Sequence, residues 1–403
     1  MGAAGSPLVR KIEAVEALRK AGDFPAALDQ IERIVAAHPR NARAVNELGI
    51  LLRLLGDPWK ASIELRKARK LAPDSPEILA NLAGCLREQG EFESAVKAYR
   101  KAIELRPDFA PVFGELGETY HAMRDAAKAA EAYERSLQLS PLNAHTLTNL
   151  ASALGELGEP QRALDVVERS LGLDSLQRRA MVVKAFALHE LGREQEAAAI
   201  FDLDWVRAFP HGEVQGFESL GAFNRALVDH VEHHPTLEFE PANRSTTKGE
   251  QTGELLQEPK GPVAQLELMI QAAVKTFLDD LPRDPEHPYL AHRPRSFRLN
   301  VWGTRLGAAG HQSHHIHPGG WVSGVYYAQL PDVIQTTGEE HAGWIQFGGA
   351  PDEWRLEKPR PLRDFQPEEG TLFLFPSYFY HRTIPFESET KRVSIAFDAI
   401  PED

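Results

Sequence analysis

The sequence of 403 residues has a single cysteine, Cys85, and no long apolar run. One thiol excludes an internal disulfide framework and suits a reducing compartment. No stretch approaches the roughly 18 apolar residues of a membrane span, and the N-terminus lacks the apolar core of a signal peptide. We therefore expect a cytoplasmic protein without a membrane segment.

Positive charge is also in short supply. Lys and Arg number 45 against 58 Asp and Glu, which gives a formal net charge of −13. Binding to the phosphates of a nucleic acid requires a basic face, so this balance argues against a general nucleic-acid binder. The remaining composition is that of a globular protein, and its length predicts two or three domains.

A 34-residue period organises the first half of the chain. Proline and glycine each recur at this step, with Arg124 as the one exception in the glycine series, and alanine always stands five residues after the glycine position. Glycine ends a helix at a sharp turn, and small residues let two helices cross closely. The pattern predicts about six helix pairs over residues 8–207. The recurring residues are Pro39, Pro73, Pro107 and Pro141; Gly22, Gly56, Gly90, Gly158 and Gly192; and Ala27, Ala61, Ala95, Ala129, Ala163 and Ala197.

This period and these residue types resemble the tetratricopeptide repeat family. The resemblance implies a superhelix whose concave groove binds a protein or peptide. In some relatives, an asparagine two positions before a small residue bonds the backbone of an extended peptide. Asn81 and Asn149 occupy that position and are candidate substrate-binding residues, with solvated surface positions as the alternative. Glu47 and Glu115 occupy it in other repeats and suggest a basic segment in the ligand.

Residues 208–295 lack the repeat register. Apolar residues at helical spacing predict helices over 214–232 and 262–281, and the polar segment 240–262 between them predicts a loop. We expect 208–295 to lead into a second domain whose core occupies 296–403.

The last part of the chain has the composition of β-strands. Its short segments are rich in β-branched and aromatic residues and are bounded by glycine or proline, which is typical of an antiparallel barrel or jelly roll. The segments are "SFRLNVWGTRL", "WVSGVYYAQL", "GWIQFGG", "TLFLFP" and "RVSIAFDAI". The expected fold class is therefore α+β and multidomain, with an all-α repeat superhelix followed by a β-rich domain with supporting helices.

Four histidines lie within residues 311–317. Residues two apart on a strand face the same way, so His315 and His317 project from one face, about 6.6 Å apart. Both imidazoles could then reach one ion, and His381, which follows an apolar strand and a proline turn, offers a third. Imidazole suits iron, zinc, copper and nickel alike, so the pattern predicts a metal site without naming the metal.

An anion site is predicted beside it. Arg392 and Ser394 share one face of the last predicted strand, opposite Val393 and Ile395. An arginine and a serine on a buried strand face require an anion as partner.

The segments "HIHPGGWVSGVYY", "GTLFLFPSYFYH" and "RVSIAF" resemble a bacterial and phage branch of the iron(II)- and 2-oxoglutarate-dependent oxygenases. The resemblance implies a double-stranded β-helix with Fe(II) and 2-oxoglutarate as cofactors. It also implies hydroxylation of a substrate, here a protein or peptide side chain recruited by the repeat groove. By the same resemblance, His315 and His381 are the first and the distal metal ligands, and Arg392 holds the C5 carboxylate of 2-oxoglutarate with help from Ser394. Further pocket residues are Asn300, Gln312 and Tyr327 for the cofactor and Tyr326 for the substrate.

One position departs from the family pattern, because His317 stands where the family has a carboxylate. Strand parity favours His317 as the third ligand. In aspartyl/asparaginyl β-hydroxylases, however, the carboxylate is absent and water fills its place, which would make His317 a bystander. Two alternatives to the hydroxylase stay open: a three-histidine dioxygenase that does not use 2-oxoglutarate, and a repeat scaffold with a degenerate oxygenase domain. The hydroxylase is favoured over the dioxygenase because only it employs Arg392 and Ser394.

Overall fold

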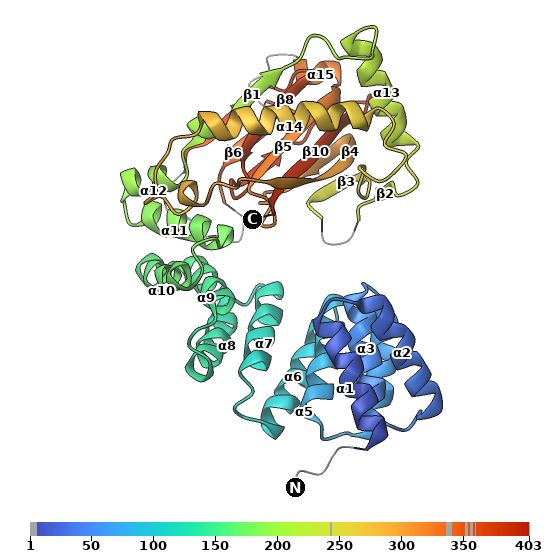
Figure 1. Ribbon diagram of the computed structural model, residues 1–403. Helices are drawn as coiled ribbons and strands as arrows, with labels where there is room; N and C mark the ends of the chain where they lie inside the picture. Colours follow the sequence, from blue (N-terminus) through green and yellow to red (C-terminus); the bar gives the residue numbers. More distant parts are fainter. Residues whose placement is uncertain are drawn as a thin grey trace. The chain divides into compact units, whose positions relative to one another are not determined.

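A computed structural model describes residues 6–241, 244–335, 341–350, 354, 358 and 360–402. The chain divides into two compact units, Met1–Leu157 and Gly158–Asp403 (Figure 1). The first unit is helical, and the second combines helices with β-sheet. Among the helices of the described ranges, none has both the length and the apolar character needed to cross a bilayer.

The first unit is the predicted stack of helix pairs. The helices α1, α3, α5 and α7 each pack against the even-numbered helix that follows, and each of these pairs packs against the next odd-numbered helix. The helices are α1 (Pro7–Lys20), α2 (Phe24–Ala37), α3 (Ala42–Leu54), α4 (Pro58–Leu71), α5 (Pro76–Glu88), α6 (Phe92–Leu105), α7 (Ala110–Ala122), α8 (Ala126–Leu139) and α9 (Ala144–Glu156). The predicted N-terminal superhelix is thereby confirmed.

The recurring residues of the sequence account for the geometry of these pairs. Gly56, between α3 and α4, has φ of +83°, which glycine adopts at little cost. Arg124, the exception in the glycine series, adopts the same left-handed conformation with φ of 62°. Gly49, the small residue two positions after Glu47, lies where two helices cross, since a Cβ there would come within 2.5 Å of Leu65 Cγ. The 34-residue register thus reflects turn conformation and close helix packing.

The second unit begins with helices that continue the repeat pattern. These are α10 (Pro160–Leu173), α11 (Arg178–Glu190) and α12 (Glu194–Ile200), followed by the short helix η1 (Leu203–Trp205). Phe186 of α11 packs against Tyr380, with 5.6 Å between ring centroids, and Arg178 Nη1 donates to the carbonyl of Pro318 at 3.1 Å. The last repeat helices are therefore built onto the β-domain.

The middle segment supplies helices and edge strands. Its elements are β1 (Arg207–Pro210), α13 (Leu220–Glu232), β2 (Glu238–Phe239), β3 (Thr246–Gln251), α14 (Val263–Asp280) and η2 (Leu290–His292). The two predicted helices correspond to α13 and α14, although α13 begins at Leu220 and not at 214. The loop prediction for 240–262 was wrong for β3, which pairs with β4. A strand of sequence "TTKGEQ" has no apolar alternation, and Thr246 and Gln251 are buried although polar.

The β-domain contains a large sheet and a small one, and the described strand pairs are antiparallel. The large sheet has the order β1-β8-β5-β10-β4-β3-β2 and the small sheet β7-β6-β9. Their further elements are β4 (Phe297–Gln312), β5 (Val322–Gln329), α15 (Asp332–Gln335), β6 (Ile345–Gly348), β7 (Leu362–Phe365), β8 (Thr371–Pro376), β9 (His381–Thr383) and β10 (Arg392–Pro401). All five predicted strand segments are present, and the arrangement is consistent with a jelly roll.

Apolar side chains join the layers of this domain. Phe347 of the small sheet meets Phe375 of the large sheet edge-on, with 4.7 Å between ring centroids. On the large sheet, α13 contacts β4 and β5 while α14 contacts β8, and Figure 1 shows α14 lying across the strands. Burial of the apolar faces of the two sheets holds in place the strands that carry the candidate site.

Candidate metal centre

Three histidines come together beside the ends of these strands. His315 follows β4 in an extended segment and forms an isolated bridge with His381, in which each backbone N–H donates to the other's carbonyl oxygen at 3.1 Å. The N–H of His317 donates to the carbonyl of Ser377 at 2.8 Å. Residues directly opposite in an antiparallel pair face the same side, so His381 joins the face shared by His315 and His317. The prediction that His315 and His317 face the same way therefore holds, although these residues lie outside a regular strand.

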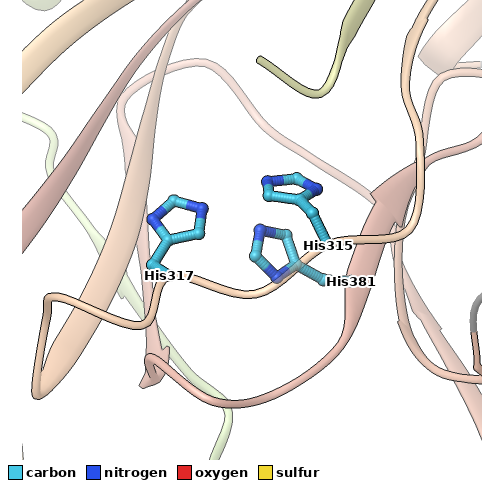
Figure 2. A group of neighbouring side chains, drawn as sticks. All are labelled: His315, His317 and His381. Atoms are coloured by element: carbon cyan, nitrogen blue, oxygen red, sulfur yellow. The ribbon is translucent and has the colours of Figure 1, made fainter. Parts of the chain in front are cut away.

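One nitrogen of each imidazole lies within 4.8 Å of the corresponding nitrogens of the other two (Figure 2). Among the described residues, no other group of three or more His, Cys, Asp or Glu side chains converges in this way. The structure thus brings together all three predicted metal ligands.

The hydrogen bonds of the rings determine which nitrogen is free. The Nδ1 atoms of His315 and His381 lie 2.7 Å and 2.9 Å from the carbonyl oxygens of Ser313 and Phe379. Nδ1 of His317 lies 2.7 Å from a carboxylate oxygen of Asp398. Carbonyl and carboxylate oxygens only accept, so Nδ1 carries the proton and Nε2 presents a lone pair. This arrangement orients histidines that bind metals.

The electrostatics of the site also favour metal binding. Burial, followed by the proximity of His317, lowers the pKa of His315 to about 3. Burial and the two neighbouring histidines lower the pKa of His381 well below its ordinary value. Both rings are neutral at pH 7, as a metal ligand must be.

Asp398 is a site residue that the sequence analysis missed. It lies on β10 opposite Ser323 of β5, whose Oγ donates to Asp398 Oδ1 at 2.6 Å. The available signal was parity, because Asp398 continues the alternation that links Arg392 and Ser394 on one face of the strand.

Arg392 lies in a cavity that the histidines also line. The residue is 1% exposed, its Nη1 is 3.4 Å from Ser394 Oγ, and its Nε has no hydrogen-bond partner among the residues that the structure describes. The guanidinium Cζ lies 4.9 Å from the centre of the Tyr327 ring. Within the described part of the chain, no carboxylate pairs with Arg392. Burial lowers the pKa of this guanidinium, a cost that an anionic ligand would remove.

Neighbouring hydroxyl groups extend this anion site. Ser394 lies opposite Thr304 of β4 on one side and opposite Tyr327 of β5 on the other. The hydroxyl of Thr304 is buried and has no hydrogen-bond partner among the described residues, and that of Tyr327 is buried beside Arg392. Thr304 was not predicted, because only strand register places it beside Ser394.

The other predicted pocket residues lie in different places. Gln312 lines the cavity of Arg392, and it also lines a second cavity on the histidines together with Asn300, Trp302 and Arg244. Tyr326 is buried, and its hydroxyl donates to Asn224 Oδ1 of α13 at 2.6 Å. Adjacent residues of a strand face opposite sides, so the structure places Tyr326 away from the cavities that Tyr327 and Asn300 line.

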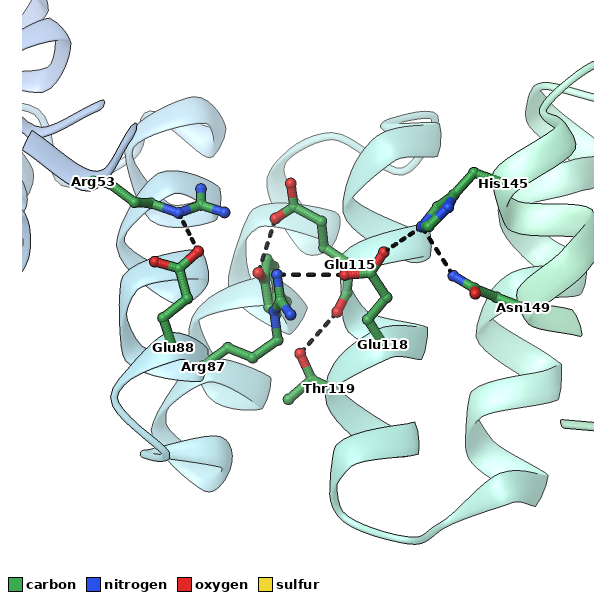
Figure 3. A network of polar contacts seen from close by, with 9 residues as sticks. Arg53, Arg87, Glu88, Glu115, Glu118, Thr119, His145 and Asn149 are labelled. Carbon is green, nitrogen blue, oxygen red and sulfur yellow. Dashed lines mark hydrogen bonds and ion pairs between the residues drawn. The ribbon is translucent and has the colours of Figure 1, made fainter. Parts of the chain in front are cut away.

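The candidate groove residues lie in a polar network across successive helix pairs of the first unit. The amide of Asn81 donates to Asn46 Oδ1 at 3.0 Å. Asn149 is 3% exposed, and its Nδ2 lies 3.1 Å from Nε2 of His145, which in turn lies 3.1 Å from Glu118 (Figure 3). The structure therefore gives both asparagines partners within the protein.

The acidic residues at the same register are also compensated. Glu47 pairs with Arg19, and Glu115 accepts a hydrogen bond from the hydroxyl of Tyr99 at 2.8 Å (Figure 3 shows Glu115). Glu47 thus has a guanidinium partner, whereas Glu115 has a neutral hydroxyl partner, and the basic ligand segment stays a prediction.

Comparisons with known proteins agree with the two parts of this description. Residues 300–398 match the family described as "Putative 2OG-Fe(II) oxygenase", and residues 12–76, 115–175 and 148–213 match "Tetratricopeptide repeat". Residues 86–123 match "TPR repeat". The N-terminal region consists of tetratricopeptide repeats, and residues 300–398 form a domain of that 2OG-Fe(II) oxygenase family.

Solved structures with similarity to this chain include repeat proteins. MamA is 26% identical with a TM-score of 0.36, over 40% of this chain and 94% of MamA. PilF of Pseudomonas aeruginosa is 22% identical with a TM-score of 0.45, over 49% of this chain and 89% of PilF. A thermophilic TPR protein of Thermus thermophilus is 21% identical with a TM-score of 0.39, over 45% of this chain and 99% of that protein. Among curated proteins, no sequence matches.

Proposed function

We propose that the protein is an iron(II)- and 2-oxoglutarate-dependent hydroxylase that acts on a polypeptide side chain. The observation that carries this proposal is Arg392, buried and without a carboxylate partner among the described residues, in a cavity shared with three histidines. The histidines suit a metal ion, and the arginine requires an anion. A metal chelator with a distal carboxylate satisfies both, and 2-oxoglutarate is such a molecule.

The residues present fit these groups. His315, His317 and His381 would hold the metal and leave its remaining positions open. Arg392, with the hydroxyls of Ser394 and Thr304, would hold the distal carboxylate. When bound, iron(II) and 2-oxoglutarate would supply oxidative chemistry in which one atom of dioxygen enters a substrate C–H bond and the other enters succinate, with release of carbon dioxide.

Apolar and amide side chains complete the cavity. Ile345 and Phe375 line it beside the histidines, and both are buried. Walls of this kind exclude water, which strengthens the interaction of the guanidinium with a bound carboxylate. Gln312 lines both cavities and is in a position to donate to a ligand in either one.

The substrate would approach through the second cavity, which is lined by Arg244, Asn300 and Trp302 and reaches His315 and His317. Tetratricopeptide repeats generally bind proteins or peptides, which favours a polypeptide substrate. In this proposal residues 8–207 recruit the polypeptide, 208–295 support the oxygenase domain, and 296–403 form its catalytic core.

Succinate formation tests the proposal. The full chain, loaded with iron(II), would be incubated with 2-oxoglutarate and a peptide pool from a cell extract. We expect peptide-dependent succinate that is lost in His381→Ala and kept in the control His341→Ala, because His341 pairs with Asp364 away from the cluster.

The alternatives give different results. A scaffold forms no more succinate than His381→Ala does. A three-histidine dioxygenase consumes oxygen with the peptide pool when 2-oxoglutarate is omitted. Either result refutes the proposed hydroxylase.

A further inference from the structure

The charge of the metal site differs from that of the family pattern. Replacing a carboxylate ligand by His317 makes the set of three side chains neutral, so that a divalent ion keeps both of its positive charges. The carboxylate of Asp398 lies 2.7 Å from Nδ1 of His317, on the side of the ring away from the other histidines (Figure 2 shows the three rings). One imidazole ring therefore separates this carboxylate from the place of the ion.

Asp398 is held in this position from several sides. Ser323 Oγ donates to its carboxylate at 2.6 Å, and the Asp398 side chain is 12% exposed. A Cβ on Gly320 would come within 3.2 Å of Asp398 Cβ and Cγ, so the absence of a side chain there leaves room for the carboxylate. Across the described residues, no lysine or arginine forms an ion pair with Asp398. The two side chains bonded to this carboxylate are therefore Ser323 and His317, and His317 is the one that belongs to the metal cluster.

We infer that Asp398 is a positioning residue that supplies, through His317, the negative charge that the family pattern places directly on the metal. This inference rests on the metal site of the proposed function. A carboxylate that accepts the Nδ1 proton orients the ring and makes Nε2 a stronger donor. The negative charge is thus carried by a residue that binds the ligand His317 and not the ion itself, and it still acts on the ion through the imidazole ring.

The inference couples positions 317 and 398. An aspartate at 317 in the present chain would lie beside Asp398, and two adjacent carboxylates repel each other. The site therefore accommodates one carboxylate, at either position.

Cobalt(II) alone is a suitable probe, because its binding to the full chain needs neither 2-oxoglutarate nor a substrate. Affinity would be measured for the wild type, Asp398→Asn, His317→Asp and the double variant. In the presence of His317, Asp398→Asn is expected to weaken binding about 10- to 100-fold. In the presence of His317→Asp, the same substitution is expected to leave binding unchanged or to strengthen it. Asp364→Asn, which alters the His341–Asp364 pair, is the matched control and should bind like the wild type.

Several outcomes overturn the inference. A merely structural Asp398 would give the same loss in both backgrounds, and an irrelevant Asp398 would give no loss with His317 present. Either result leaves the proposed function standing, whereas a wild type that binds no cobalt(II) refutes the proposed metal site itself.

A measurement without substitution covers the case in which a variant fails to fold. In the zinc(II)-loaded wild type, the Nδ1 proton of His317 should give a downfield NMR signal that is protected from exchange. An unprotected proton contradicts the bond to Asp398.

Discussion

Replacing Arg392 with methionine should have opposite effects on stability and on ligand binding. The guanidinium is 1% exposed, and no carboxylate in the described ranges pairs with it, so the ligand-free protein bears the cost of a buried charge. Burying an ion costs several kcal/mol. The contact of the Arg392 guanidinium with the ring of Tyr327 offsets only about 0.5–2 kcal/mol of this cost. Arg392→Met should therefore leave the free energy of unfolding unchanged or raise it.

The same substitution should weaken binding of 2-oxoglutarate strongly. Loss of one partner from a buried charged pair costs about 2–5 kcal/mol. At about 1.4 kcal/mol per tenfold, this is a roughly 30- to 4000-fold increase in the dissociation constant.

Denaturant unfolding of the metal-free protein and calorimetric titration of the metal-loaded protein measure the two effects. Arg305→Met is the contrasting control, because Arg305 pairs with Glu250 at 2.6 Å and with Glu232 at 3.2 Å. It should lower stability by about 1 kcal/mol and leave 2-oxoglutarate binding unchanged. The reasoning is refuted if Arg392→Met destabilises the metal-free protein by about 2 kcal/mol or more, or binds 2-oxoglutarate like the wild type.

Three further predictions follow from burial and packing. The folded pKa values of His315 and His381 lie below the unfolded value, so protons bind the unfolded chain first and stability falls as the pH drops below about 6.5. At pH 5, His315 should cost the metal-free protein about 2 kcal/mol, seen as a lower Tm, and His381 should act in the same direction. An unchanged pH profile after both are replaced by glutamine would contradict this. Gly324→Ala should destabilise the protein by about 1–3 kcal/mol, because the new Cβ would lie 2.3 Å from Phe397 Cζ. Gly172→Ala, whose Cβ would have nothing within 4 Å, should instead stabilise α10. Equal effects of the two substitutions in denaturant unfolding would count against this packing. Burial raises the pKa of the Cys85 thiol to about 12, so a thiol reagent at pH 8 should react only after unfolding, and rapid reaction of the native protein would exclude this burial.

The repeat region could be predicted almost entirely from the sequence, because its structure is local and periodic. The glycine of each turn has a positive φ and the alanine five residues later is buried in every repeat, and Arg124 shows that the fold tolerates one exception by accepting a left-handed backbone. The strands from β4 onward were predictable for a similar reason, since apolar and β-branched runs mark buried strands. The polar strand β3 was not, because its pairing with β4 and not its composition makes it a strand.

The candidate site was predictable where a face of a strand could be followed along the chain. Parity selected His315 and His317, and it also linked Arg392 with Ser394. Partners on neighbouring strands depend on register, which no single segment reveals. Thr304 and the bond from Ser323 to Asp398 therefore emerged only from the structure.

The most direct test of the central claim is an anaerobic titration of the iron(II)-loaded protein with 2-oxoglutarate, followed by visible absorption. Chelation of iron(II) by the keto acid produces a charge-transfer band that neither component has alone. We predict a band that saturates at one 2-oxoglutarate per chain and that requires a far higher concentration in Arg392→Met. A protein that binds iron(II) but shows no band, or a band insensitive to the loss of Arg392, would contradict the account.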